Sequence, residues 1–157
     1  IRLSLVGSEM CIRDRPHLVI LYTGQLDHEV NMTTLCRQLA DAMLGVKDEA
    51  GQAVFPTGGT RVLAYPAPHY AVADGGAAGQ AAGGTGDYAF VYLNLRMGRG
   101  RSEATQQRAG QNLLEVAKAF FAPVMAQRHI GITLQIDVGP EVFDAKHSNL
   151  HPLFNKA

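Results

Sequence analysis

Arginines beside glycine-containing turns are the side chains of this sequence best suited to bind an anion. Arg61 follows a Gly-Gly turn at the head of an expected strand, and Arg101 stands at the start of an expected helix. A guanidinium group binds a carboxylate through two parallel hydrogen bonds and stays charged throughout. Surface arginines are more often simply solvated. We expect Arg96 and Arg99, which lie in the same basic patch as Arg101, to be solvated. The alternative is that they help to attract a multiply charged acid.

Two further patterns indicate ligand chemistry only weakly. The Gly98–Ser102 segment (GRGRS) is typical of an anion-binding loop before a helix, but it lacks the glycine and lysine pattern of a nucleotide loop. His147 and His151 stand four residues apart near Asp144, a spacing that suits a metal ion only on a helix. Their region shows no helical pattern. We therefore expect neither a nucleotide cofactor nor a metal.

The charge balance argues against nucleic acid and membrane partners. Fourteen basic residues offset fourteen acidic ones, so no net field attracts a polyanion. Tyr88, Phe90 and Tyr92 share a strand face in the manner of a base-stacking platform, yet with this balance we interpret them as core or active-site wall. No apolar run approaches the ~18 residues of a membrane span. Cys11 and Cys36 form no disulfide framework, and Cys36 has the apolar neighbours of a buried residue, so we expect a cytoplasmic protein.

The first half of the chain predicts a strand, a helix and a second strand. The apolar run of residues 17–22 (HLVILY) indicates a buried strand. Between residues 31 and 44 the apolar side chains recur every three or four positions, which predicts an amphipathic helix. Residues 60–65 (TRVLAY) predict a second strand that ends at Pro66 and Pro68.

The second half repeats this plan after a glycine- and alanine-rich segment. Residues 74–86 (DGGAAGQAAGGTG) have no large apolar side chain, so we expect a mobile loop without a packed element. Alternating residues predict a long strand over 87–97. A helix is predicted from the N-cap Ser102 to about Arg128, with a kink before Pro123, and a fourth strand follows over 132–137.

Two βαβ units predict an α+β fold, a two-layer sandwich in which two helices cover one face of a four-stranded sheet. Residues 16–157 then form a single domain. The long strands carry apolar residues on both sides, and no helix remains for the second face. We therefore expect copies of the chain to pack through that face as a homo-oligomer. The apolar tail from Glu141 onward is expected to dock on the body or on a neighbour.

Six short motifs occur in order along the chain, and none of them is specific alone. They are Pro16-His17, Phe55-Pro56-x-x-Gly59-x-Arg61, Ala73-Asp74-Gly75, Asp87-Tyr88-Ala89-Phe90-Val91, Gly98-x-Gly100-Arg101-Ser102 and Asn149-x-His151-x-Leu153-Phe154. Together they resemble the 5-carboxymethyl-2-hydroxymuconate isomerases of the tautomerase superfamily. The resemblance spans Pro16 to Lys156. It implies a trimer, no cofactor, and a role in aromatic-acid catabolism through the homoprotocatechuate pathway.

The resemblance also implies a catalytic set of Pro16, Arg61 and Arg101. In this family an amino-terminal proline acts as general base, and a free α-amine titrates near ~7.7 to 8.0, close enough to neutrality to take up and return a proton. One arginine is expected to hold a substrate carboxylate and the other to polarise the carbonyl end. The chain departs from the family in its longer 74–86 segment, in Pro123, and in the residues that precede Pro16.

Residues 1–15 (IRLSLVGSEMCIRDR) resemble translated adapter or cloning sequence, and we expect them to be a non-native extension. While they are attached, the Pro16 nitrogen is a tertiary amide without a basic lone pair. We therefore expect the chain as written to be inactive and the working protein to begin at Pro16. Two alternatives stay open: another tautomerase that acts on a smaller 2-hydroxymuconate, and a non-catalytic oligomeric binding module on the same fold.

Overall fold

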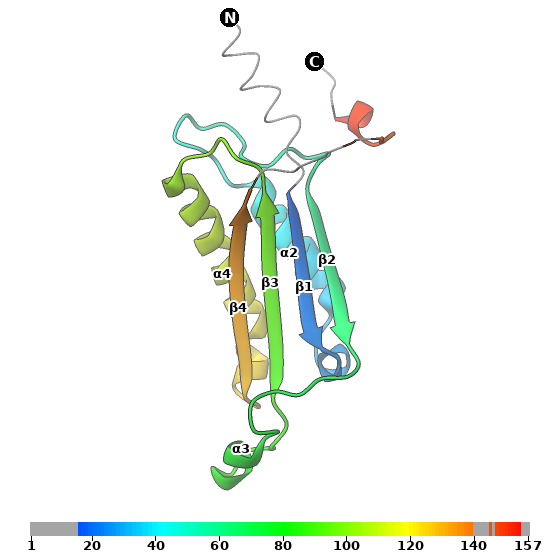
Figure 1. The fold of residues 1–157 in the computed structure, drawn as a ribbon, viewed down its shortest axis with the longest axis vertical. Coiled ribbons are helices and arrows are strands. Elements are labelled where there is room, and N and C mark those ends of the chain that lie inside the picture. The colour runs from blue at the N-terminus through cyan, green and yellow to red at the C-terminus, as the bar shows by residue number, and fades with distance from the viewer. Residues whose placement is uncertain (1–15, 140–144, 146, 155–157) are drawn as a thin grey trace, which may run out of the picture.

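A four-stranded sheet and two long helices form the body of the molecule (Figure 1). The computed structural model describes residues 16–139, 145 and 147–154, so the predictions for residues 1–15 and 141–144 lie outside the described residues. The strands are β1 (His17–Thr23), β2 (Arg61–Ala67), β3 (Ala89–Met97) and β4 (Ile130–Val138). The helices are η1 (Gly24–His28), α2 (Met32–Leu44), α3 (Ala77–Ala81), α4 (Glu103–Met125) and η2 (His151–Leu153).

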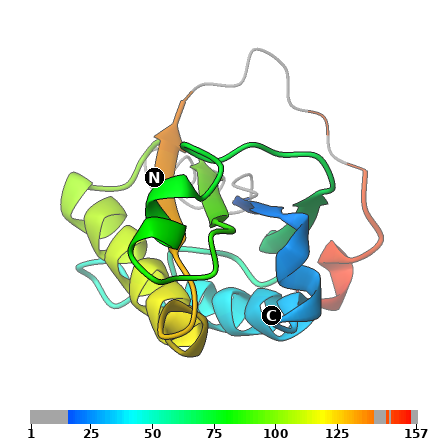
Figure 2. The ribbon, with the colours of Figure 1, turned by 90° about the horizontal axis from the view of Figure 1, so that it is seen from below.

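The strand order β2-β1-β3-β4 confirms the predicted pair of βαβ units. β1 and β2 are parallel and are joined through α2, and β3 and β4 are parallel and are joined through α4. The two units meet where β1 pairs antiparallel with β3. Figure 2 shows α2 and α4 on the same side of the sheet, which is the predicted two-layer arrangement.

The core lies between the sheet and these two helices. Every second residue of β1 and β3 faces the helices, because side chains alternate across a strand. The buried strand residues include Leu18, Ile20, Val91, Leu93 and Leu95, and the buried helix residues include Leu35, Leu39, Met43, Leu113, Ala117 and Phe121. Since the whole buried cluster falls between Leu18 and Val124, it draws on no described residue of the tail.

Both long helices begin at polar caps, of which Ser102 was predicted from the sequence and Asn31 was not. The Asn31 side chain accepts a hydrogen bond from the Thr34 amide, and Ser102 accepts one from the Thr105 amide. α4 ends at Met125, three residues before the predicted end, and Pro123 lies in its last turn. A kink at that proline stays a prediction. Among the described helices, none combines the length and the apolar character that a membrane span requires.

The prediction that Pro66 ends the second strand is wrong, because β2 continues to Ala67. β2 is the outer strand of the sheet and has a partner only in β1, where Tyr22 pairs with Pro66. A proline has no backbone N–H to donate to a neighbouring strand. An edge strand tolerates this loss, because one of its sides has no neighbouring strand. The sequence pattern of β2 did not reveal that it is an edge.

The prediction of a loop without a packed element is wrong over residues 77–81, which form α3. The Asp74 carboxylate accepts hydrogen bonds from the Gly76 and Ala78 amides at 3.0 and 2.9 Å, and these bonds hold the pKa of that carboxyl below its ordinary value. The Tyr88 hydroxyl accepts a third bond from the Gly79 amide at 2.9 Å. Polar contacts therefore organise the segment where apolar ones are missing. Its mobility stays a prediction.

Gly76 is the most constrained position of this segment. Its φ is +102°, and a Cβ added there would lie 1.0 Å from the Gly86 carbonyl oxygen. We expect Gly76→Ala to lower the free energy of unfolding by about 2 to 3 kcal/mol, because backbone strain and overlap add together. Gly83→Ala is the matched control, since its φ is +85° but nothing lies within 4 Å of the added carbon. Urea denaturation of both variants tests this, and equal losses would contradict it.

The sheet face away from the helices is open in the single chain (Figure 1). It carries Leu21, Leu63 and Tyr65, whose exposed fractions are 47, 43 and 50 %. Phe90 and Tyr92 also face this side, because they alternate with the buried residues of β3. Of the two interpretations of these aromatic residues, the chain's own core is therefore wrong for Phe90 and Tyr92, and the active-site wall stays a prediction. The apolar open face agrees with the expectation that further chains cover it.

The described part of the tail leaves its large apolar side chains exposed. Leu150, Leu153 and Phe154 are 46, 62 and 51 % exposed, and none belongs to the buried cluster. The tail was expected to dock either on the chain's own body or on a neighbouring chain. The body does not bury these three side chains. A neighbouring chain stays the expected one.

Candidate active site

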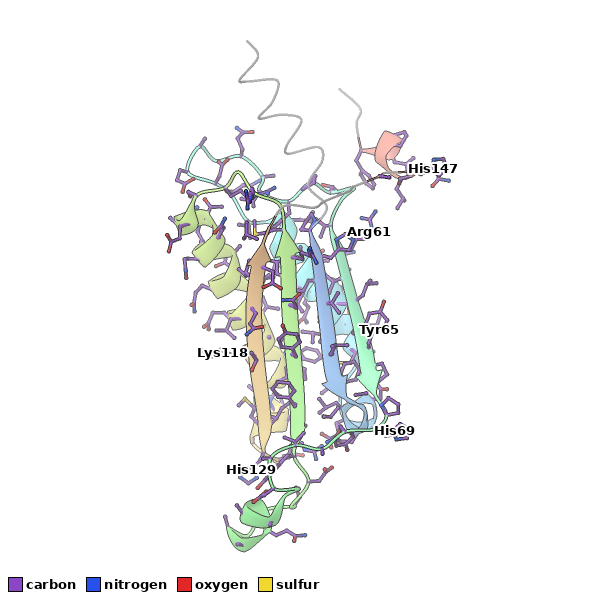
Figure 3. The ribbon with its side chains drawn as sticks, in the orientation of Figure 1. Arg61, Tyr65, His69, Lys118, His129 and His147 are labelled. Atoms are coloured by element: carbon purple, nitrogen blue, oxygen red, sulfur yellow. The ribbon has the colours of Figure 1, made fainter. Side chains whose placement is uncertain are left out.

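Strand direction brings the three predicted site residues to one end of the sheet. β1 and β2 are parallel and both begin there, while β3 runs the other way and ends there, just before Arg101. The Arg61 amide donates a hydrogen bond of 3.2 Å to the Pro16 carbonyl oxygen. Figure 3 shows Arg61 at this end of β2, well above Tyr65 on the same strand. Pro16 and Arg61 are therefore direct neighbours across the two strands.

The Arg61 side chain is positioned by backbone carbonyl groups. Its Nη1 donates to the Gly58 oxygen at 2.9 Å and to the Thr60 oxygen at 3.2 Å. Among the described residues, no carboxylate pairs with this guanidinium, and no acceptor is recorded for its Nε and Nη2. Those two nitrogens form the edge that binds a carboxylate in parallel. The carbonyl contacts orient the charge without neutralising it.

Arg101 is fixed by a different set of contacts. Its Nη2 donates to the Val54 carbonyl oxygen at 2.6 Å, and its Nη1 donates to the Gly98 oxygen at 3.4 Å. The guanidinium carbon lies 5.9 Å from the centre of the Phe55 ring, a cation–π distance, and Phe55 is only 1 % exposed. Arg101 thus rests on a buried aromatic residue just ahead of α4.

One short segment, residues 54–60, positions both arginines. Val54 and Phe55 hold Arg101, while Gly58 and Thr60 hold Arg61. The segment is itself fixed by the Pro56 carbonyl oxygen, which accepts hydrogen bonds from the amides of residues 59 and 60 and from the Thr60 hydroxyl. Sequence reasoning noted Phe55-Pro56 only as part of a motif. Its role as a common support requires the fold, since 47 residues separate Val54 from Arg101.

Sequence reasoning also missed Glu49. The Ser102 hydroxyl donates a hydrogen bond to the Glu49 carboxylate while it accepts the capping bond from the Thr105 amide. The hydrogen bond from Ser102, then bonds from the backbone of Glu49 and from Thr105, hold the pKa of this exposed carboxyl below its ordinary value. Glu49 is therefore ionised at neutral pH at the start of α4. No local pattern could reveal this contact, because 53 residues separate the partners.

The other candidates from the sequence lie apart from this arrangement or outside the description. Arg96 and Arg99 are both exposed, as predicted for solvated residues. His147 is exposed in the tail, and the side chain of His151 and all of Asp144 lie outside the described residues. Within the described part of the chain, no group of three or more His, Cys, Asp or Glu side chains is arranged to hold a metal ion.

This end of the sheet has the properties of an anion-binding site beside a potential base. Arg61 begins β2 on one side of β1, and Arg101 follows β3 on the other side. Positive charge nearby lowers the pKa of an amine, so a free prolyl nitrogen here would be neutral in a larger fraction of molecules at neutral pH. A neutral amine with fixed cations around it can accept a proton from an acid that the cations hold.

Comparison with known proteins identifies the family of this chain. The family model for 5-carboxymethyl-2-hydroxymuconate isomerase matches residues 16–154. A solved 5-carboxymethyl-2-hydroxymuconate delta-isomerase shares 64 % identity, covers 92 % of this chain and 96 % of its own, and superposes with a TM-score of 0.89. A solved 5-carboxymethyl-2-hydroxymuconate isomerase from Deinococcus radiodurans R1 shares 31 % identity over 92 % of this chain and 97 % of its own, with a TM-score of 0.74.

A relative from Escherichia coli, 5-carboxymethyl-2-hydroxymuconate Delta-isomerase, is 27 % identical over 139 residues, which are 88 % of this chain and 98 % of the relative. The match to the family model begins at Pro16, the residue just before β1. It covers the strands, both long helices and both arginines. The chain therefore belongs to the 5-carboxymethyl-2-hydroxymuconate isomerase family.

Proposed function

We propose that this protein, with a free amine at Pro16, isomerises 5-carboxymethyl-2-hydroxymuconate without a cofactor, within aromatic-acid catabolism. Membership of the family supports the reaction. The observation that carries the assignment to residues is the hydrogen bond from the Arg61 amide to the Pro16 carbonyl oxygen, at 3.2 Å. This bond makes an arginine the direct neighbour, across two strands, of the one residue of the set that can act as a base.

The reaction needs a proton to leave one atom and another to arrive several atoms away. The neutral Pro16 amine accepts the proton of the substrate's 2-hydroxyl group, and the carbonyl bond forms at C2. The double bonds shift along the chain, and a proton is delivered to C5, which leaves an unsaturated ketone. No atom is lost and no electron is exchanged with a second reagent. A single base that cycles between its neutral and protonated forms therefore suffices.

The arginines stabilise the charge that this transfer creates. When the hydroxyl proton leaves, negative charge develops on the C2 oxygen, and a guanidinium held in advance costs no reorganisation at that moment. Arg61 has its Nε and Nη2 edge directed by carbonyl contacts through Nη1, so we assign it the substrate carboxylate. Arg101, held at the start of α4, then polarises the carbonyl end.

Ultraviolet absorbance of the dienol substrate, followed with protein that begins at Pro16, tests the proposed function. The expected result is an enzyme-dependent loss of the dienol and the appearance of the conjugated ketone. Parallel rates on 2-hydroxymuconate, which lacks the carboxymethyl group, distinguish this activity from that of a tautomerase for a smaller acid. Absence of turnover on both acids would exclude either enzyme and leave the non-catalytic module.

We further propose that the protein assembles as a homotrimer through the open face of the sheet. The half-exposed Leu21, Leu63 and Tyr65 support this, because three large apolar side chains on one face favour burial. We expect Leu21→Glu to shift the sedimentation mass to that of a monomer. Met125→Glu, on an equally exposed position at the end of α4, should leave the mass unchanged. Equal masses for both variants would contradict the proposal.

A cytoplasmic location belongs to the same proposal. Its support is a free thiol at Cys36, which is partly exposed and packs against the core, and is not the fully buried residue that was predicted. Burial raises the pKa of this thiol, so it stays protonated near neutral pH.

A further inference from the structure

Four polar side chains form a straight row across the end of the sheet that carries Pro16. His17 pairs with Arg61 on β2 and with Arg96 on β3, and Arg96 pairs with Asp137 on β4. Residues in register point to the same face of a sheet, and neighbouring strands lie about 4.8 Å apart. The row lies on the open face, because the next residues along β1 and β3, Leu18 and Leu95, are buried against the helices.

The acid at the end of this row does not neutralise Arg96. The Asn94 side-chain amide donates a hydrogen bond of 2.9 Å to the Asp137 carboxylate, which directs that carboxylate along the strand. Among the described residues, no hydrogen bond or ion pair of Arg96 is recorded, and its side chain is exposed. Arg96 therefore keeps its charge and its donors for a partner outside the described chain.

Arg61 and Arg96 stand on the two strands that flank β1, so their Cα atoms are separated by about 10 Å. They stand on opposite sides of His17, the first residue of β1, which Pro16 precedes. A single small acid that contacts the Pro16 nitrogen thus has one arginine on each side. Two cations so placed favour a ligand with carboxylates at separate positions over a ligand with a single one.

We propose that Arg96 binds the third carboxylate of the substrate, that of the carboxymethyl group, and so selects a tricarboxylic acid over a dicarboxylic one. The inference rests on the proposed function, because it divides the carboxylates of that substrate between Arg61 and Arg96. It also changes the role of Arg96 from a solvated residue to a specificity-determining one. An exposed arginine in the neighbouring turn, Arg99, has no partner strand and takes no part.

The test compares Arg96→Gln with the control Arg99→Gln, both in protein that begins at Pro16. Turnover is measured on 5-carboxymethyl-2-hydroxymuconate and on 2-hydroxymuconate. We expect Arg96→Gln to lower the ratio of kcat/KM for the tricarboxylate to that for the dicarboxylate about tenfold or more, mainly through KM. Arg99→Gln should keep the ratio of the unchanged protein. Equal ratios for the two variants would overturn the proposal.

A binding measurement separates a failure of this inference from a failure of the proposed function. Calorimetry with propane-1,2,3-tricarboxylate and with glutarate needs no turnover. A preference for the tricarboxylate that Arg96→Gln removes supports the inference even if neither dienol is converted. Turnover with an unchanged preference overturns the inference and leaves the proposed function in place. A lower sedimentation mass for Arg96→Gln would also overturn it, because Arg96 would then be a contact between subunits.

Discussion

Protein that begins at Pro16 should isomerise the dienol, and the same protein with one alanine placed before Pro16 should be slower by about 10²- to 10⁴-fold. The added residue converts the ring nitrogen from a secondary amine into an amide, which removes its basic lone pair. The full 157-residue chain has Pro16 in the same amide state and should be equally slow. The measurement is kcat for each form, with the amino terminus of each verified by intact mass.

The fold provides the control for this comparison. The described core lies between Leu18 and Val124, so neither removal of residues 1–15 nor addition of one alanine takes a side chain from it. The forms should therefore unfold at similar temperatures while their turnover differs. Full turnover by the form whose Pro16 is confirmed to be in an amide bond would exclude Pro16 as the base, whatever the other residues do.

Arg61→Gln should lower kcat by about 10²- to 10³-fold, because the substrate carboxylate loses the fixed cation and the paired N–H edge that hold it in position beside the base. Glutamine retains a donor of similar length, so the loss isolates the charge and the paired N–H edge. Arg37→Gln is the control. Arg37 is exposed on α2, where it pairs with Asp41 at 2.7 Å on the helix surface. If both variants kept the original turnover, Arg61 would not belong to the catalytic set.

Arg101→Gln should show the same loss of turnover together with a lower unfolding temperature. Arg101 holds the Val54 carbonyl and lies over the Phe55 ring, so its removal also loosens the segment that supports Arg61. The recorded side-chain hydrogen bonds of Arg61 to described residues go only to carbonyls of its own turn, so Arg61→Gln should unfold close to the original temperature. Measuring the unfolding temperature together with kcat thus separates the structural role of Arg101 from the purely catalytic role proposed for Arg61.

Helices α2 and α4 could be predicted from the sequence because their signals are local. Apolar residues recur at helical spacing, and Asn31 and Ser102 provide polar caps at the first turns. The failures have non-local causes. β2 passes through Pro66 because it is an edge strand, and strand order cannot be read from one strand. α3 forms because Tyr88 and Asp74 satisfy its backbone, which composition alone does not reveal.

Some features of the candidate site could likewise be predicted from the sequence, and others required the structure. The proximity of Pro16 and Arg61 follows from the predicted βαβ unit, because parallel strands begin at the same edge of a sheet. The support of both arginines by residues 54–60 does not follow from it. Arg96 shows the limit most clearly: its residue type predicts a solvated cation, whereas its register beside His17 is the observation that supports our proposal for it. Register between strands requires the structure.

The most direct test of the central claim is a crystal structure of the Pro16-initiated protein with propane-1,2,3-tricarboxylate. We expect one ligand whose carboxylates lie within about 3.5 Å of the Arg61 and Arg101 guanidinium groups and whose body adjoins the Pro16 nitrogen. A ligand bound elsewhere, or one that the Pro16 nitrogen and the two guanidinium groups cannot all reach, would contradict the proposed mechanism.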